Sequence, residues 1–327
     1  MKASLFLALV VLFVAGEPPQ ASAQAMPGEY RVGLLSTGGE AANQSHFSTD
    51  LIRDFAQRGL VLGQNLVVER RAAHGRVDSL PQLVSELQAS RVGVIVTLGY
   101  PAALAAKERT SLPVVVVRAG DPVADGLVAS FGHPGGHLTG LSEVAAELSA
   151  KRLALLKEAV TNVRRVAMLW NSDDLGMSLR YRAAEVEARR LGLEVQSYGV
   201  RAPNDFDAAF AAMTRRPPDA ILMVTDVLTT LNRKRVIDFA AEHKLPAIYE
   251  YDFLVRDGGL MSYGPDLDEM FDHAAGLAVR ILNGANPAEL PLETPTRFVL
   301  AINLAMAAKI GLKMPASLLA RADDAIE

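Results

Sequence analysis

The sequence predicts an α/β fold made of two Rossmann-like lobes, each with its own open parallel sheet. One observation is a strand that runs through a glycine directly into a helix, over Val94–Lys107. Another is that this strand–turn–helix pattern recurs along the chain and restarts after the glycine-rich stretch Pro134–Gly140. The length of 327 residues is also sufficient for two domains of ordinary size.

The stretch Val94–Lys107 carries the clearest local signals. Four apolar or β-branched residues, Val94–Thr97, are typical of a strand buried on both faces. Gly99 provides the tight turn, and Pro101 lies where a helix begins, because its missing N–H costs nothing there. Such a turn aims backbone N–H groups at one point, which favours an anion or a polar ligand head.

The first half of the chain alternates strands and helices in the manner of a parallel sheet with right-handed crossovers. The other expected strands are Arg31–Ser36, Leu66–Arg70 and Pro113–Val117. The expected helices are 41–58, 79–90 with Asp78 as its N-cap, and the helix that follows Pro101.

The second half repeats the alternation without a residue-by-residue repeat. Its expected strands are Arg165–Trp170, Glu194–Val200, Ala220–Val224 and Pro246–Tyr249. Its expected helices are 146–160, 176–191 with Gly192 as its stop, one from Asp205 to about 215, and one ending at Lys244.

The tail contains a strand over Gly259–Gly264, a helix over 266–283, a strand over Arg297–Ile302 and a short helix from Leu304. It is too short for a third domain, so we expect it to cross back between the lobes. The N-terminal lobe is therefore expected over 27–138 with part of 265–300. The C-terminal lobe is expected over 139–262 with part of 297–327.

The first 23 residues predict an export signal that is cleaved after Ala23, which would place the mature protein in the periplasm. Lys2 is a positive start, Leu5–Ala15 is a short apolar core, and Ala21–Ala23 is a small-x-small cleavage site. The alternative is a membrane anchor, but the apolar run is about half of the ~20 residues that a spanning helix needs.

Composition excludes several functions. The formal net charge is −4 and no dense Lys/Arg run occurs, which argues against binding to nucleic acid. The chain has no cysteine, so disulfides, thiolate metal sites, cysteine nucleophiles and a lipoprotein anchor are excluded.

Ligands of open parallel sheets bind at the carboxyl ends of the strands, and two facing lobes would share one cleft. The candidate ligand-binding residues at these strand ends are Ser36, Thr37, Gly38, Gly99, Tyr100, Pro101, Asp121, Asn171, Ser172, Asp226, Glu250 and Tyr251. The set suits a small ligand with a cationic group, an anionic or polar group, and an apolar or aromatic body.

For each of the three candidate carboxylates, a structural role is an alternative to ligand binding. Asp121 either binds a ligand ammonium or caps the turn before Pro122, and Asp226 either does the same or caps the next helix. Glu250 either faces the cleft or forms only a surface ion pair.

The aromatic residues also leave alternatives open. Tyr100 is either a stacking platform for the ligand or a lid between the lobes. Trp170 ends its strand and belongs either to the cleft or to the core. Tyr249 and Tyr251 point to opposite sides of a continued strand, so at most one faces the cleft.

The sequence shows no catalytic signature. The G-x-S-x-G, Walker, H-E-x-x-H and G-x-G-x-x-G patterns are all absent. His133 and His137 have metal-ligand spacing, but Pro134–Gly136 between them favours a hinge loop over a metal-binding helix. We therefore expect no enzyme, no cofactor and no metal.

Four stretches and the chain ending resemble the ABC-transporter substrate-binding protein family that includes tryptophan- and tyrosine-binding members. They are Gly99–Ala105, Gly120–Ser130, Pro134–Ser142, Gly259–Pro265 and the ending Leu318–Asp323. The resemblance covers essentially all of the mature chain. It implies a type I periplasmic-binding-protein fold, with two lobes joined by three crossovers, and delivery to a membrane permease with an ATPase.

Three departures from the family pattern lie at the expected cleft. Tyr100 stands where many members have Thr or Ser, Asn171–Asp173 replaces Asn-Pro, and Asp226-Val227 replaces Asp-Pro. The ligand of better-known members therefore need not be the ligand of this chain.

The sequence thus predicts a monomeric, periplasmic solute receptor of an ABC importer. The expected ligand is an aromatic or branched amino acid or a related aromatic carboxylate. The alternatives are a sensor that presents its ligand to a membrane receptor, and an exported hydrolase on the same scaffold.

Overall fold

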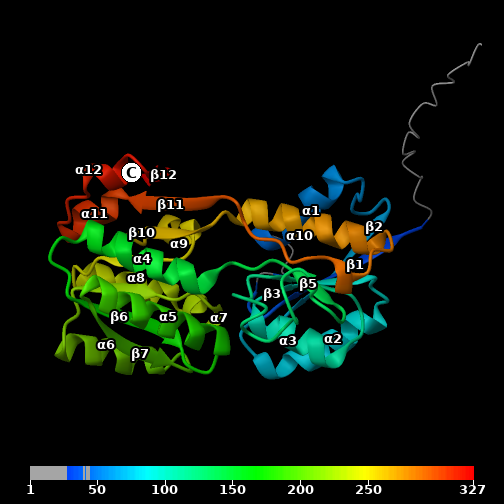
Figure 1. Cartoon of the computed structure of the whole chain (residues 1–327), viewed down its shortest axis with the longest axis horizontal. Helices are drawn as coiled ribbons and strands as arrows, with labels where there is room; N and C mark the ends of the chain where they lie inside the picture. Colours follow the sequence, from blue (N-terminus) through cyan, green and yellow to red (C-terminus); the bar gives the residue numbers. More distant parts are fainter. Residues whose placement is uncertain (1–27, 40, 42–44) are drawn as a thin grey trace, which may run out of the picture.

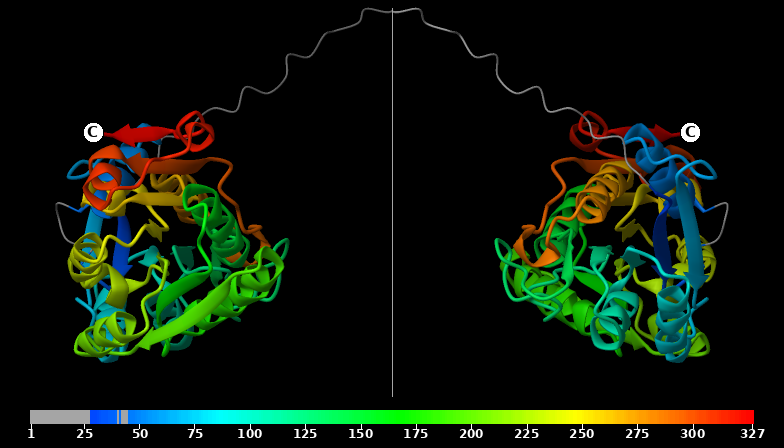
Figure 2. Two further views of the ribbon diagram at one scale, coloured as in Figure 1. Left: turned by 90° about the vertical axis from the view of Figure 1, so that its left-hand side faces the viewer. Right: turned by 90° about the vertical axis from the view of Figure 1, so that its right-hand side faces the viewer.

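The computed structural model describes residues 28–39, 41 and 45–327, and these form two lobes that lie side by side (Figure 1). The end-on views show the C-terminal strand at the upper edge of the molecule (Figure 2). The expected signal segment 1–23 lies outside the described residues. No helix in the described part of the chain is long and apolar enough to cross a membrane.

The first sheet is parallel throughout, with the strand order β2-β1-β3-β4-β5. In that order the strands are Leu66–Ala72, Tyr30–Ser36, Val94–Leu98, Val114–Val117 and Leu138–Gly140. Strands β3 and β4 are buried along their whole length because helices cover both faces of the sheet.

The second sheet has the strand order β12-β11-β10-β9-β8-β6-β7. In that order the strands are Asp324–Ile326, Phe298–Asn303, Met261–Pro265, Ala247–Tyr249, Ala220–Met223, Arg165–Asn171 and Glu194–Val200. Only the β10–β11 pair is antiparallel. The α/β fold with parallel sheets is therefore confirmed, with one antiparallel pair that the sequence did not predict.

Helices pack on both faces of each sheet, and the side chains between helices and sheets form four clusters of buried apolar residues. The first lobe has α1 (His46–Gln57), η1 (Val77–Ser79), α2 (Leu80–Ala89), α3 (Tyr100–Arg109), α10 (Leu267–Leu282) and η2 (Pro287–Glu289). The second lobe has α4 (Ala145–Ala159), α5 (Leu175–Leu191), α6 (Asp205–Arg215), α7 (Val227–Leu231), α8 (Arg233–Glu242), α9 (Asp252–Arg256), α11 (Leu304–Ile310) and α12 (Ala316–Leu319).

The chain passes between the lobes three times, after β5, after β10 and before β11 (Figure 1). Hydrogen bonds join the first and third passages, because Ser142 N–H donates to the Glu293 carbonyl at 2.9 Å and Glu293 N–H donates to the Gly140 carbonyl at 3.0 Å. As expected for the tail, α10 returns to pack on α1 of the first lobe. Because β5 ends at Gly140 in the first sheet, we propose the lobe boundary within residues 141–144.

Several local expectations are wrong. Asp78 does not cap a helix but lies inside η1, and α2 starts at Leu80 with Pro81 in its first turn. The single helix expected to end at Lys244 is α7 and α8, separated at Asn232, whose side chain donates to the Leu228 carbonyl at 2.9 Å.

Five short elements were not expected at all. Strands β5 and β12 and the 3-10 helix η2 have 3 residues each, α12 has 4 residues and α9 has 5 residues. Segments of this length show no periodicity, and their pairing with distant strands is decided by tertiary contacts.

We predict that Gly140→Ala destabilises the first lobe. Gly140 has φ 146°, and an added Cβ would lie 2.2 Å from the Val116 carbonyl oxygen in the neighbouring strand. The expected cost is about 3 kcal/mol or more, measured as a fall of several degrees in the melting temperature. In the control Gly132→Ala the new Cβ meets no heavy atom within 4 Å, so equal melting of the two variants would contradict the prediction.

Candidate functional site

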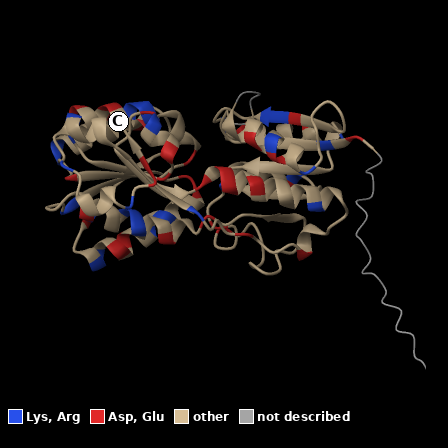
Figure 3. Ribbon diagram, turned by 90° about the horizontal axis from the view of Figure 1, so that it is seen from above, with Lys and Arg blue, Asp and Glu red and all other residues tan. Residues whose placement is uncertain are grey.

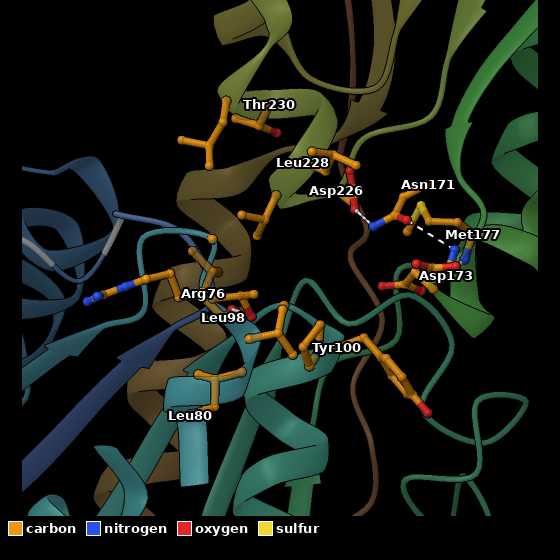
Figure 4. A pocket seen from close by; sticks show the side chains of 18 of the residues that line it. Arg76, Leu80, Leu98, Tyr100, Asn171, Asp173, Met177, Asp226, Leu228 and Thr230 are labelled. Atoms are coloured by element: carbon orange, nitrogen blue, oxygen red, sulfur yellow. Dashed lines mark hydrogen bonds between the residues drawn. The ribbon is translucent and has the colours of Figure 1, made fainter. Parts of the chain in front are cut away.

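A cavity of about 750 Å³ lies between the lobes, lined by residues from both (Figure 4). The first lobe contributes the segments after β1, β2, β3 and β4, and the second contributes those after β6, β7, β8 and β9. In particular, Gly99–Pro101 and Asn171 face the same space, as the two-lobe arrangement predicted. The size is within the usual range for small-molecule sites.

Seven of the twelve candidate residues line this cavity and five do not. The lining residues are Thr37, Gly99, Tyr100, Pro101, Asn171, Asp226 and Tyr251. The others are Ser36, Gly38, Asp121, Ser172 and Glu250. Both groups of residues come from the same strand ends, so position in the sequence does not distinguish the residues that line the cavity from those that do not.

The residues outside the cavity have structural contacts instead. Ser36 is fully buried, and its hydroxyl donates to the Gly38 carbonyl at 3.2 Å. Asp121 accepts from the N–H groups of Val123 and Ala124, which is the turn-capping alternative. Ser172 accepts from Arg201 Nε at 3.2 Å.

The turn into α3 has the expected geometry, with an additional partner. Gly99 has φ 94° and precedes the helix, and Pro101 lies in its first turn. The hydroxyl of Thr37 accepts from Ala102 N–H at 3.2 Å. One of the N–H groups expected to face a ligand is therefore already bound by a side chain of the same wall.

Asp226 combines two roles on the opposite wall. It N-caps α7 in a capping box with Thr229, so the capping alternative is confirmed. Its second carboxylate oxygen accepts from Asn171 Nδ2 at 2.6 Å, and Asn171 in turn accepts from Asp173 N–H at 3.1 Å (Figure 4). These hydrogen bonds fix the Asp226 carboxylate and the Asn171 amide in place on the cavity wall.

Two of the four discussed aromatic residues line the cavity. Tyr100 lies at its edge, with the hydroxyl pointing away from Asp226 and Leu228 (Figure 4). Tyr251 lines the cavity and Tyr249 is buried in the core, which agrees with the expectation that at most one faces the cleft. Trp170 is not a lining residue; it stacks on Tyr181 with ring centroids 4.8 Å apart.

Glu250 is not a surface residue but part of a buried ion-pair network. Its side chain is 2% exposed and accepts from Arg152 and Arg180, each at 2.9 Å. Arg180 also approaches Glu143 at 3.4 Å. No sequence pattern indicated this network, because Arg152 and Arg180 lie in helices, where a charged residue is ordinarily exposed to solvent.

Glu143 connects this network to both lobes. It accepts from Gly120 N–H of the first lobe at 3.0 Å, and from the Tyr251 hydroxyl and Arg180 of the second. Tyr251 also lines the cavity, so the network lies next to the cavity wall. We call the part of the wall at Tyr251 the cavity floor.

Two further carboxyl groups lie close to each other between the lobes, that of Asp125 in the first lobe and that of Asp174 in the second. Asp125 lies in the loop after β4 and Asp174 is the N-cap of α5. An added Cβ on Gly176 would lie 3.2 Å from an Asp125 oxygen and 3.3 Å from an Asp174 oxygen, so the two carboxyls flank this glycine. One Asp125 oxygen is buried without a hydrogen-bond partner among the described residues.

This environment raises the pKa of Asp125 to about 7. Burial is the main cause, Arg180 from α5 opposes it, and Asp174 and Asp121 add repulsion. Burial also raises the pKa values of Asp174 and of Tyr100, which faces Asp125 from α3.

The described residues contain no group of three or more His, Cys, Asp or Glu side chains that could hold a metal ion. His133 and His137 lie in non-helical chain before and at the start of β5, as Pro134–Gly136 predicted. Acidic and basic residues are interspersed over both lobes in the view from above (Figure 3).

A family profile matches most of the chain, and solved structures share its fold. A family profile described as ABC transporter substrate binding protein matches residues 46–326. A tyrosine-binding protein from Clostridioides difficile is 23% identical over 253 residues, which are 77% of this chain and 72% of that protein.

Two solved structures share the fold over nearly the whole chain. An ABC domain from Streptococcus pneumoniae in complex with L-Trp has a TM-score of 0.85 and 22% identity, covering 91% of this chain and 100% of that one. A conserved domain protein from Vibrio cholerae has a TM-score of 0.84 and 22% identity, covering 90% and 99%.

We predict that stability falls with rising pH because of Asp125. In the folded protein this carboxyl holds its proton up to about pH 7, whereas in the unfolded chain it loses it near pH 4. The folded state therefore binds more protons between these values, so the free energy of unfolding decreases as pH rises through this window.

Asp125→Asn removes this ionisation without changing the shape of the side chain. We expect it to raise the melting temperature by several degrees at pH 8, and the gain to shrink as the pH is lowered toward 4. Asp78→Asn, at an exposed residue of η1, is the control. A gain that is the same at pH 8 and pH 4.5 would contradict the prediction.

Proposed function

The chain belongs to the ABC transporter substrate-binding protein family, and we propose that it is an exported receptor for an aromatic amino acid. The observation that carries this proposal is the cavity shared by the strand-end loops of both lobes. Branched amino acids and related aromatic carboxylates are the next candidates, because they have the same amphipathic character.

The chemistry of the cavity wall supports this ligand class. Apolar side chains, among them Leu80, Leu98, Leu104 and Leu228, offer a surface for a ring or a branched chain. Asp226 and Asn171 offer oxygen acceptors for an ammonium group. The tyrosine-binding relative and the L-Trp-bound neighbour support an aromatic ligand over an aliphatic one.

The lobes also meet at the cavity rim. Gly75 of the first lobe lies so close to Leu231 of the second that an added Cβ would be 3.1 Å from its methyl group. A ligand held by both walls would stabilise this closed arrangement over an open one. We propose that a membrane permease with its ATPase recognises the closed form in the periplasm and that the signal segment is removed after Ala23.

We predict that the mature protein, residues 24–327, binds L-tyrosine or L-tryptophan in isothermal titration calorimetry. The ligand should also raise the melting temperature, because it binds only the folded state. The titrated ligand should be recovered unchanged by mass spectrometry, whereas a product would favour the exported hydrolase. Absence of heat and of a melting shift with both amino acids would rule out this ligand class.

Tyr100→Ser introduces a residue that many family members have at this position. We expect affinity for the aromatic amino acid to fall roughly tenfold, because an aromatic wall of the cavity is lost. Tyr198→Ser is the matched control, since Tyr198 does not line the cavity. An equal loss of affinity in both variants would show that Tyr100 acts only through folding.

A further inference from the structure

The carboxyl groups of Asp125 and Asp174 come from different lobes and are both buried. Asp125 belongs to the loop after β4, and Asp174 precedes α5 of the second lobe. The two residues are 5% and 8% exposed, and an oxygen of each lies within 3.3 Å of the point that a Gly176 Cβ would occupy. Because Gly176 belongs to the second lobe, separation of the lobes would bring water to the Asp125 carboxyl.

The Asp125 oxygen that faces the second lobe lacks compensation. This atom, Oδ2, lies 3.2 Å from the Gly176 Cβ position and is buried without a hydrogen-bond partner in the described part of the chain. Asp174, in contrast, accepts from Met177 N–H at 3.1 Å as the cap of α5. A buried carboxylate oxygen without a partner is costly, and a proton on it removes the charge.

The cation that faces Asp125 from α5 is shared with other carboxylates. Arg180 donates to Glu250 at 2.9 Å and approaches Glu143 at 3.4 Å. Arg152 also donates to Glu250 at 2.9 Å. In this network two arginines balance two glutamates, so an ionised Asp125 adds an excess negative charge beside it.

The groups that face Asp125 from the other elements do not offset this charge. Asp121, on the same loop, adds repulsion. From α3, Tyr100 faces the carboxyl, and Lys107 donates to the Gly126 carbonyl at 2.6 Å. Burial, reinforced by the neighbouring carboxylates, raises the pKa of Asp125 to about 7 in this closed arrangement.

We propose that closure of the lobes takes up a proton, which Asp125 holds beside Asp174, so that the receptor closes more readily at acidic than at neutral pH. This inference rests on the opening and closing that belong to the proposed function. It does not depend on which ligand the cavity holds.

The direction of the pH dependence follows from the two forms of the carboxyl. In the open form a hydrated Asp125 loses its proton near pH 4, and in the closed form it keeps the proton up to about pH 7. The closed form therefore binds more protons between these values. Raising the pH through this window shifts the equilibrium toward the open form.

The first test measures the separation of the lobes without a ligand. The chain has no cysteine, so Ser85→Cys on α2 and Lys234→Cys on α8 place one fluorophore on each lobe. Both positions are exposed. Single-molecule energy transfer on the mature protein then gives the populations of short and long label distances at pH 5 and pH 8.

In the wild type we expect the short-distance population to be larger at pH 5. Between the two pH values the ratio of closed to open form should fall by up to about 100-fold. Asp125→Asn keeps the shape of the side chain without its ionisation, so its populations should be equal at both pH values. Asp125→Ser should remove the pH dependence as well.

Two further variants separate the charge of Asp125 from other effects. Asp174→Asn retains a good helix cap and should only reduce the pH response, because it removes repulsion but not burial. Asp268→Asn, at an exposed residue of α10, should respond to pH as the wild type does.

The second test counts protons when a ligand binds. L-tryptophan does not titrate near pH 6, so calorimetric titrations at this pH in buffers of different ionisation enthalpy report protons taken up by the protein. We expect the wild type to take up close to one proton per bound ligand and Asp125→Asn to take up almost none.

The outcomes distinguish this inference from the proposed function. Lobe distances that are the same at pH 5 and pH 8 in the wild type would overturn the inference, as would an equal pH response in the wild type and Asp125→Asn. L-tryptophan that binds without proton uptake would overturn it and leave the aromatic ligand class standing. If neither L-tryptophan nor L-tyrosine binds but the distances respond to pH through Asp125, the ligand class fails and the inference stands.

Discussion

The contacts of Glu143 are the constraint on which the relation between the two lobes depends. Its carboxylate accepts from Gly120 N–H on one side and from the Tyr251 hydroxyl and Arg180 on the other. The side chain is 2% exposed, and a buried carboxylate is tolerated only when its oxygens are paired. The crossover that contains Glu143 is thereby fixed to both sheets at the floor of the cavity.

The rest of the buried network extends this fixed point into the second lobe. Arg180 and Arg152 share Glu250, and Arg152 Nε donates to the Tyr263 carbonyl of β10 at 2.6 Å. At the cavity rim, Gly75 of the first lobe lies against an apolar side chain of the second lobe, Leu231. A floor held by buried ion pairs and a rim with an apolar contact would favour opening of the cleft at the rim.

The sequence predicted the parts of the site that depend on local chemistry. Gly99 and Pro101 define a strand–turn–helix by their own backbone preferences, and Asp226 caps a helix with Thr229 only three residues away. The role of Glu250 was missed because its partners, Arg152 and Arg180, are 98 and 70 residues away in the chain. No local pattern reports such pairs, since only the packing of α4 and α5 on the sheet brings them together.

The same distinction explains how one architecture can serve different ligands. The sheets and the buried network position the loop ends, and several residues that line the cavity, among them Tyr100, Arg118 and Asn171, lie at or just after the carboxyl ends of strands. Substitution there leaves the strand pairing and the apolar clusters intact, because none of these residues belongs to the buried core. Substitutions at Tyr100 or Asn171 would therefore change the surface that a ligand meets without changing the frame that presents it.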